Sequence, residues 1–399
     1  MKKVLIIMPS MFIGGAERSL LGLLENLDYR ELSVDLFLYR HEGELLKYIP
    51  KQINVLPEIC DYRTFDTPIK SLLFSRQFRF GLARIASKIA LHLHCLITGE
   101  KSGVWMSMQY TARFLQPFLP NIEGSYDIGI MYLGIADTLI NKVQAKMKFT
   151  WNHTDYDTLF PDCHMDLQTY AKVDWLVSVS DTCTKKIIKR YPQISTKAIT
   201  IENTLSKNLI KSQAADPIDD PRWIDCGEYK LLSIGRFSDA KNFDNIPNIC
   251  HKLLEKGVPV RWYIIGYGGE EQLIQQKIKE EGMQDNVIIL GKKENPYPYI
   301  KACDLYVQPS RYEGKCVAVR EAQMLGKPVV ITRYATSSSQ LEDNVDGVIV
   351  PMDNEGCAKG IAALLENQAK MIRLSGNCRQ RDYSNAGEVK KLENIWGVD

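Results

Sequence analysis

The sequence lacks both an ordered cysteine pattern and a strong excess of charge. Its 10 cysteines are scattered, with no C-x-x-C pair, so neither a disulfide framework nor a zinc site is indicated. Reduced, buried thiols in a cytoplasm are the expected state. The formal net charge is only +2, which gives the chain no bulk affinity for nucleic acid.

Long apolar runs are absent as well. The N-terminal segment "MKKVLIIMPS" has a short apolar run that ends at Pro9, too short for a signal peptide. No stretch reaches about 18 apolar residues, so we expect no transmembrane helix. There is no internal repeat and no low-complexity tract. The 399 residues exceed one ordinary core, and we expect two domains of about 200 residues each in a cytoplasmic protein.

Acidic residues are scarce in one segment, from Thr67 to Pro120. Glu100 is its one acid, against seven basic residues interleaved with Leu, Ile, Phe and Trp. The pattern predicts a basic amphipathic helix or helix pair. Two interpretations stay open: a helical subdomain whose cations face water, or a surface that lies on anionic lipid headgroups at the inner face of the cytoplasmic membrane. The basic residues are Lys70, Arg76, Arg79, Arg84, Lys88, Lys101 and Arg113.

Strand-like and helix-like segments alternate along the whole chain, which predicts an α/β protein with parallel sheets. A polar stretch with two prolines at 206–228 separates two such series. We therefore predict doubly wound, Rossmann-like domains at 1–206 and 207–375, and a helical tail at 376–399 that packs back on the first domain. Ligands of such domains bind beyond the carboxyl ends of the strands, here in a central cleft that both domains face. The predicted strands lie in "KKVLIIM", "SVDLFLY", "YDIGIMY", "KFTWN", "DWLVSVS", "KAITI", "YKLLSI", "VRWYII", "NVIILG", "DLYVQ", "KPVVIT" and "DGVIV".

Two acids stand eight positions apart, at Glu313 and Glu321. If both belonged to one helix that begins near Glu313, about 12 Å along the axis would separate them, on neighbouring faces. The free N–H groups of the helix start would lie between them and attract phosphate. The spacing alone is weak evidence, because such pairs occur by chance in many helices.

Further motifs stand in order around this pair. They are "GRFSDAKN" (235–242), "IIGYGG" (264–269), "DLYVQPSRYEG" (304–314), "REAQMLGKPVV" (320–330) and "DGVIVP" (346–351), with "GGAER" near the N-terminus. Together they resemble retaining glycosyltransferase family 4, of the glycosyl transferases group 1 type. The resemblance is strong over 230–352 and weaker over 1–206. It implies a GT-B fold, a nucleotide-sugar donor and no metal cofactor.

The resemblance also implies roles for individual residues. Arg236 and Lys241 would neutralise the diphosphate leaving group, and Glu321 would hold the ribose hydroxyls. Glu313 would lie at the donor sugar, as nucleophile, hydroxyl clamp or charge stabiliser. His153, at a predicted strand end, would contact the donor or orient the acceptor, although a lone His is more often structural. The further expected donor-binding residues are Gly14, Gly15, Gly235, Gly266, Gly314, Lys315, Cys316 and Val317.

The sequence departs from the family pattern at several places. Lys315 replaces the usual Phe or Leu, and three interpretations stay open: an extra phosphate contact, a changed choice of sugar, or a side chain that points to solvent. Arg320 replaces an aliphatic residue, and Tyr267 replaces Asp. The segment "YATSSSQ" (334–340) replaces a Gly-Gly-x-x-Glu loop near the donor sugar. These differences bear on which sugar is carried.

Asp155 and Asp157 form a D-x-D pattern, which binds a metal in the other major glycosyltransferase fold. Acids at this spacing are common in proteins. The alternatives to a metal-binding role are therefore a contact with the acceptor or no role in the site. No metal is expected.

We therefore predict a hexosyltransferase of bacterial surface-polysaccharide biosynthesis (capsule, O-antigen or exopolysaccharide). Its donor would be a UDP-sugar, or alternatively a GDP-sugar, and its acceptor a hydroxyl of a glycan or lipid-linked saccharide. The alternatives are a nucleotide-sugar epimerase of the same architecture and a non-catalytic nucleotide-sugar-binding protein. A dinucleotide dehydrogenase is disfavoured, because no G-x-G-x-x-G follows the first strand.

Overall fold

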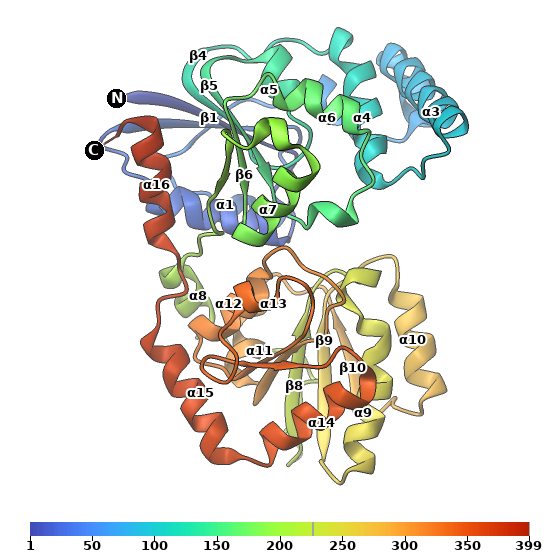
Figure 1. Cartoon of the computed structure of the whole chain (residues 1–399), viewed down its shortest axis with the longest axis vertical. Coiled ribbons are helices and arrows are strands. Elements are labelled where there is room, and N and C mark those ends of the chain that lie inside the picture. The colour runs from blue at the N-terminus through green and yellow to red at the C-terminus, as the bar shows by residue number, and fades with distance from the viewer. Residues whose placement is uncertain (226, 399) are drawn as a thin grey trace. The chain divides into compact units, whose positions relative to one another are not determined.

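The computed structural model describes residues 1–225 and 227–398, except the side chain of residue 208 (Figure 1). The chain divides into two compact units, Met1–Asn203 with Ala386–Asp399, and Thr204–Asn385. The predicted domain boundary at 206/207 lies within a few residues of this division. The predicted tail is split, because 376–385 belong to unit 2 and only the last helix belongs to unit 1.

Unit 1 is built on a parallel sheet with the strand order β3-β2-β1-β4-β5-β6-β7. Its interior strand β1 has five consecutive fully buried residues, Val4–Met8, which explains the unbroken apolar run in the sequence. Helices cover both faces of the sheet at a strand of this kind. Its residues are therefore apolar throughout and do not alternate with polar ones. The strands are β1 (Lys2–Met8), β2 (Leu32–Leu38), β3 (Asn54–Val55), β4 (Ser125–Met131), β5 (Gln144–Asn152), β6 (Trp175–Ser178) and β7 (Ala198–Thr200).

The C-terminal helix α16 (Ala386–Trp396) completes the core of unit 1. It packs on α1 (Gly15–Asn26), as Figure 1 shows, and its Leu392 and Trp396 join the same apolar cluster as Leu20 and Leu24. The other helices are α2 (Ile69–Leu73), α3 (Phe78–Thr98), α4 (Val104–Leu115), α5 (Asp137–Lys142), α6 (Cys163–Tyr170) and α7 (Asp181–Arg190), with 3-10 turns at Leu46–Tyr48, Cys60–Phe65, Gln116–Phe118, Tyr156–Thr158 and Pro192–Ile194.

Unit 2 repeats the design with the strand order β10-β9-β8-β11-β12-β13, again all parallel. One apolar cluster lies on each face of the sheet. The strands are β8 (Tyr229–Ile234), β9 (Val260–Ile265), β10 (Val287–Gly291), β11 (Leu305–Gln308), β12 (Val329–Thr332) and β13 (Val348–Val350). The helices are α8 (Lys207–Gln213), α9 (Ile246–Glu255), α10 (Glu271–Glu280), α11 (Tyr297–Ala302), α12 (Val317–Met324), α13 (Ser337–Gln340), α14 (Asn354–Leu365) and α15 (Gln368–Gln380), with 3-10 turns at Asp239–Lys241 and Phe243–Asn245.

In both sheets the spatial order of the strands switches to the other side beside the first strand of the unit. In unit 1 the reversal lies between β1 and β4, and in unit 2 it lies between β8 and β11. Connections leave such neighbouring strands toward opposite faces of the sheet, so side chains just past their carboxyl ends are free to meet a ligand. This topology marks the residues that follow β8 and β11 as the first place to look for a site.

A buried carboxyl group is part of the core of unit 1. Asp166 on α6 is 3% exposed and accepts hydrogen bonds from Gln109 Nε2 at 2.7 Å, from the Tyr191 hydroxyl at 2.8 Å and from the Tyr156 hydroxyl. Burial raises the pKa of Asp166 from 3.8 to about 7, against the lowering effect of the hydrogen bonds to Tyr191, Trp105 and Gln109.

This shift predicts a pH-dependent stability. The folded chain keeps the Asp166 proton up to a pH of about 7, whereas the unfolded chain releases it near pH 3.8. The contribution is therefore complete at low pH and lost as the pH rises from about 4 to 7, by at most about 4 kcal/mol. Thermal unfolding measured from pH 4 to pH 8 should show a smaller fall of the midpoint for Asp166→Asn than for the parent. Parallel curves for the two proteins would contradict the assignment.

Candidate functional site

An ion pair joins the two segments that follow β8 and β11. Lys241 Nζ lies 2.5 Å from Glu313 Oε1, and the Ser310 hydroxyl donates to the same oxygen at 2.7 Å. The side chains of Lys241 and Glu313 are 18% and 11% exposed. Both hydrogen bonds go to Oε1. Among the described residues, none donates a hydrogen bond to the second carboxylate oxygen of Glu313, Oε2.

The pair keeps the Lys241 ammonium charged. Burial is the largest single effect and lowers the pKa of Lys241, but the interactions with Glu313 and with the neighbouring Cys316 together raise it by more, so the net pKa lies well above the ordinary value. The neighbouring Arg236 guanidinium acts in the opposite direction. Lys241 therefore carries a full positive charge at any physiological pH.

The loop after β8 carries a second cation. Arg236 is exposed and close enough to Lys241 to affect its pKa. Glycines let this loop approach the next strand: Gly266 has φ +159°, and a Cβ there would lie 1.9 Å from the Gly235 carbonyl oxygen. Any larger residue at 266 would push the two strand ends apart. Gly235 and Gly266 thus shape the loop on which the two cations lie.

Glu313 and Glu321 do not share a helix, so the supposition of a helix that begins near Glu313 does not hold. Helix α12 begins at Val317, and Glu313 lies in the preceding loop. The cause is tertiary, because the backbone groups of the loop bond to a distant segment: Thr336 Oγ1 donates to the Glu313 carbonyl at 2.7 Å, and the Cys316 N–H donates to Gln340 Oε1 at 2.7 Å. The axial separation calculated for a shared helix does not apply.

Glu321 lies on α12 itself and is 2% exposed. Its Oε1 accepts a hydrogen bond from the Tyr297 hydroxyl at 2.8 Å. Tyr297 belongs to α11, the helix that precedes β11 in the chain, and its hydroxyl orients the Glu321 carboxylate. The two acids are therefore held by different partners, Glu313 by Lys241 and Glu321 by Tyr297.

The segment that replaces the family's Gly-Gly-x-x-Glu loop binds the Glu313 loop at several points. Gln340, in short helix α13, also donates from Nε2 to the Cys316 carbonyl at 3.2 Å. Lys315 is 8% exposed, and its Nζ donates to the Ser339 carbonyl. Lys315 therefore does not point to solvent. Burial raises the pKa of the Cys316 thiol to about 12, which keeps it protonated.

The predicted site residues of unit 1 follow the ends of β1 and β5. Gly14 precedes α1, where a Cβ would lie 2.1 Å from the Glu17 carboxylate, and Gly15 is the first residue of the helix. His153 Nε2 lies 2.8 Å from the Tyr132 carbonyl oxygen. Since a carbonyl can only accept, Nε2 carries the proton and Nδ1 has the lone pair. Burial lowers the pKa of His153 to about 4, so the ring is neutral.

Sequence reasoning missed two polar residues beside His153. Asn152 and Ser178 are partners in the register of β5 and β6, at the carboxyl ends of both strands, and are 5% and 0% exposed. Asn152 Nδ2 and Ser178 Oγ have no hydrogen-bond partner in the described part of the chain. A polar residue at the last position of a strand, as in "TWNH" and "LVSVS", is the signal that could have identified them.

The acids of the D-x-D pattern are engaged by a cation. Lys186 Nζ lies 2.5 Å from Asp155 Oδ2 and 3.4 Å from Asp157 Oδ2. Asp155 also accepts from the Asp157 N–H at 3.1 Å. Within 1–225 and 227–398, no group of three or more His, Cys, Asp or Glu could hold a metal ion.

Comparisons with known proteins show a match to one family and similarity to several glycosyltransferases. Residues 218–381 match the family described as "Glycosyl transferases group 1". The chain is 31% identical over 144 residues to the amylovoran biosynthesis glycosyltransferase AmsK of Erwinia amylovora, a match that covers 34% of this chain and about a third (35%) of the relative. It is 28% identical over 362 residues to the putative glycosyltransferase EpsF of Bacillus subtilis, which covers 84% of this chain and 80% of the relative.

The fold agrees with these matches. A crystal structure of S. aureus TarM in complex with fondaparinux, alpha-GlcNAc-glycerol and UDP aligns with a TM-score of 0.70, over 100% of both chains at 15% identity. Two parallel, doubly wound sheets of this kind define the GT-B architecture. The chain thus has the GT-B architecture, and its residues 218–381 match the glycosyl transferases group 1 family.

The ion pair of the site makes a prediction for stability. Lys241→Met should destabilise unit 2 by about 3 kcal/mol, because it leaves the Glu313 carboxylate mostly buried without its cation. The double variant Lys241→Met/Glu313→Gln should recover most of this loss, since neither side chain is then charged. A double-mutant cycle by denaturant unfolding measures the coupling. A single variant as stable as the parent would show that the pair is not formed.

Proposed function

We propose that this protein is a retaining glycosyltransferase that moves a hexose-type sugar from a nucleotide sugar to a hydroxyl of a glycan or lipid-linked acceptor. We favour a UDP-sugar as donor and bacterial surface polysaccharide as product. The observation that carries the proposal is the Lys241–Glu313 pair at the strand-order reversal of unit 2, inside the segment that matches the glycosyltransferase family. The similarity to AmsK, named for amylovoran biosynthesis, and to TarM in complex with UDP supports the choice of product and donor.

The cations of the loop after β8 suit a diphosphate leaving group. When the bond between the sugar carbon and the phosphate oxygen breaks, negative charge develops on that oxygen. Lys241 is already charged and held in place by Glu313, and Arg236 is exposed beside it. Fixed positive charges of this kind stabilise the transition state without reorganisation, which is why we propose that no metal cofactor is needed.

The two acids suit the two ends of the donor. A carboxylate can accept two hydrogen bonds from a diol, and we assign Glu321 to the ribose hydroxyls. We assign Glu313 to the donor sugar, where its Oε2 can accept from a sugar hydroxyl while Oε1 keeps Lys241. We assign Glu313 the role of hydroxyl clamp and charge stabiliser rather than nucleophile, because pairing with the Lys241 ammonium lowers the nucleophilicity of the carboxylate.

The proposed reaction proceeds on one face of the sugar. The acceptor oxygen bonds to the sugar carbon as the bond to the phosphate oxygen breaks, and the acceptor proton passes to the leaving phosphate. The protein then positions the reactants and stabilises charge. In unit 1 we assign acceptor contacts to the neutral His153 and to Asn152 and Ser178 beside it, since Asn152 Nδ2 and Ser178 Oγ have no partner among the described residues and suit sugar hydroxyls.

Nucleotide sugars are the ligands that test this assignment first. A thermal-shift panel of UDP- and GDP-sugars should raise the unfolding midpoint with one or a few donors, because a ligand that binds only the folded form stabilises it. Transfer of labelled sugar to an acceptor then separates a transferase from an epimerase, which would return an isomerised donor. Donor binding without any turnover would favour the non-catalytic alternative.

Removing either cation should slow the reaction. We expect Lys241→Ala and Arg236→Ala to reduce turnover of the donor by at least about tenfold, as the loss of one charge-stabilising group does in other enzymes. Lys279→Ala, which removes an exposed cation on α10, is the matched control and should leave turnover unchanged. Near-normal rates for both site variants would refute the phosphate role.

The contacts of Gln340 predict a graded effect on donor affinity. Gln340→Glu keeps an acceptor for the Cys316 N–H but loses the donor to the Cys316 carbonyl, and Gln340→Met loses both. Calorimetric titration with UDP should therefore give affinities in the order parent, Glu variant, Met variant, with about tenfold between the extremes, the loss expected for about one hydrogen bond. Equal affinities for all three proteins would show that the Gln340 contacts do not position the donor site.

A further inference from the structure

The outward face of α3 carries an apolar stripe. Its exposed side chains follow each other at spacings of three, four or seven residues, so they share one side of the helix. They are Phe78 (47% exposed), Leu82 (54%), Ile89 (56%), Leu93 (50%) and Leu96 (66%). A soluble surface helix normally has polar residues on the face that it turns to water, so this stripe requires an explanation.

Neighbouring segments extend the apolar surface. Phe74, just after α2, is 85% exposed, Ile97 at the end of α3 is 84% exposed, and Val104 at the start of α4 is 79% exposed. Helix α3 packs against both α2 and α4 and lies at the edge of unit 1 (Figure 1). We call the five stripe residues together with Phe74, Ile97 and Val104 the α3 surface.

Cations flank the stripe. At about 100° per residue, Arg79 lies on one side of the stripe and Lys88 on the other, and both are exposed. Lys70 and Arg76 are exposed on and after α2. Helix α3 contains no acid, and Glu100 is the only acid of the segment 67–120. An apolar stripe bordered by cations is the arrangement that suits an interface between acyl chains and anionic headgroups.

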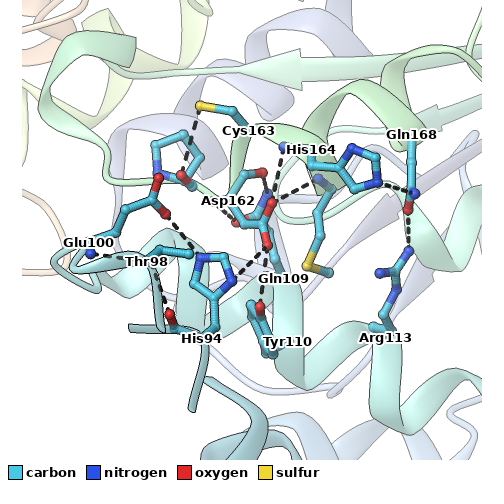
Figure 2. Close-up of polar contacts among 12 residues, drawn as sticks. His94, Thr98, Glu100, Gln109, Tyr110, Arg113, Asp162, Cys163, His164 and Gln168 are labelled. Carbon is cyan, nitrogen blue, oxygen red and sulfur yellow. Dashed lines mark hydrogen bonds and ion pairs between the residues drawn. The ribbon is translucent and has the colours of Figure 1, made fainter. Parts of the chain in front are cut away.

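The inner face of α3 holds the helix on unit 1. Phe80 and Ala83 are buried in the core cluster that includes Leu72, and Arg84 donates to the Thr64 carbonyl at 3.1 Å. Polar contacts hold the C-terminal end, as Figure 2 shows: His94 Nε2 lies 2.9 Å from Glu100 Oε2, and His94 Nδ1 lies 3.8 Å from Asp162 Oδ2. Asp162 in turn caps α6 by accepting from the His164 and Met165 N–H groups.

These inner contacts decide between two membrane arrangements. Among the described residues, α3 is the one helix whose length and mean hydropathy of 1.3 would allow it to cross a bilayer, and 22% of its apolar window is buried. A crossing helix would leave unit 1, expose Phe80 and Ala83 and break the contacts of Arg84 and His94. A helix that lies in the plane of the interface keeps all of them.

We propose that the α3 surface docks the protein on an anionic lipid bilayer, with α3 parallel to the membrane plane and its apolar stripe among the acyl chains. The side chains of Arg79 and Lys88 reach the headgroup phosphates from either side of the stripe. The proposal goes beyond glycosyl transfer and stands without it, because it rests on side chains of α2, α3 and α4 that the proposed reaction does not use.

Sedimentation with lipid vesicles tests the proposal. The full chain should bind vesicles that contain a phosphatidylglycerol fraction at least about tenfold more tightly than pure phosphatidylcholine at low salt, and the difference should shrink in about 0.5 M salt. Leu93→Ser/Leu96→Ser should abolish binding to both kinds of vesicle. Arg79→Gln/Lys88→Gln should abolish the preference for anionic lipid. All four substituted side chains are exposed, so circular dichroism and the unfolding midpoint should be unchanged.

Matched controls lie in unit 2. Leu273→Ser/Ile372→Ser removes two apolar side chains that are 38% and 71% exposed, and Lys279→Gln/Lys359→Gln removes two exposed cations. Both should bind vesicles like the parent. Equal sedimentation with neutral and anionic vesicles, or none with either, would overturn the proposal. So would a dimer in light scattering that Leu93→Ser/Leu96→Ser dissociates, because the α3 surface would then be covered by a second copy of the chain.

Discussion

A mostly buried ammonium group cannot stay charged without a counter-charge, and the site of unit 2 depends on that constraint. Lys241 obtains its counter-charge from Glu313, on the segment after the neighbouring strand β11. Parallel pairing of β8 and β11 brings the two segments together at the same edge of the sheet. A hydrogen bond donated by Thr336 and one accepted by Gln340 then fix the loop that carries Glu313. A preformed cation is thereby available for a phosphate before any ligand arrives.

The two units use the same doubly wound topology for different chemistry. Unit 2 places ionised groups beyond its strand-order reversal, whereas unit 1 places a neutral imidazole and small polar side chains beyond the ends of β5 and β6. Charge suits a nucleotide diphosphate, and neutral hydrogen-bonding groups suit the hydroxyls of a saccharide. Unit 1 also carries the apolar, cation-flanked α3 surface, which is separate from its polar strand ends.

Much of this arrangement could be predicted from the sequence. Apolar runs such as "VLIIM" predicted the buried parallel strands, and the ordered motifs predicted the segments that hold Arg236, Lys241, Glu313 and Glu321. The start of α12 could not be predicted, because Gln340, far along the chain, bonds the backbone of Cys316. The direction of the Lys315 side chain could not be predicted either, because its partner is the Ser339 carbonyl. Helix propensity and spacing are local properties, and these contacts are tertiary.

A crystal structure of the protein with UDP can decide whether the Lys241–Glu313 pair holds the donor phosphate. We expect a β-phosphate oxygen within about 3 Å of Lys241 Nζ, with Glu313 still bonded to that ammonium through Oε1. We also expect ribose hydroxyls within hydrogen-bonding distance of the Glu321 carboxylate. A nucleotide bound away from the ends of β8 and β11, with Lys241 contacting Glu313 alone, would contradict this role of the pair.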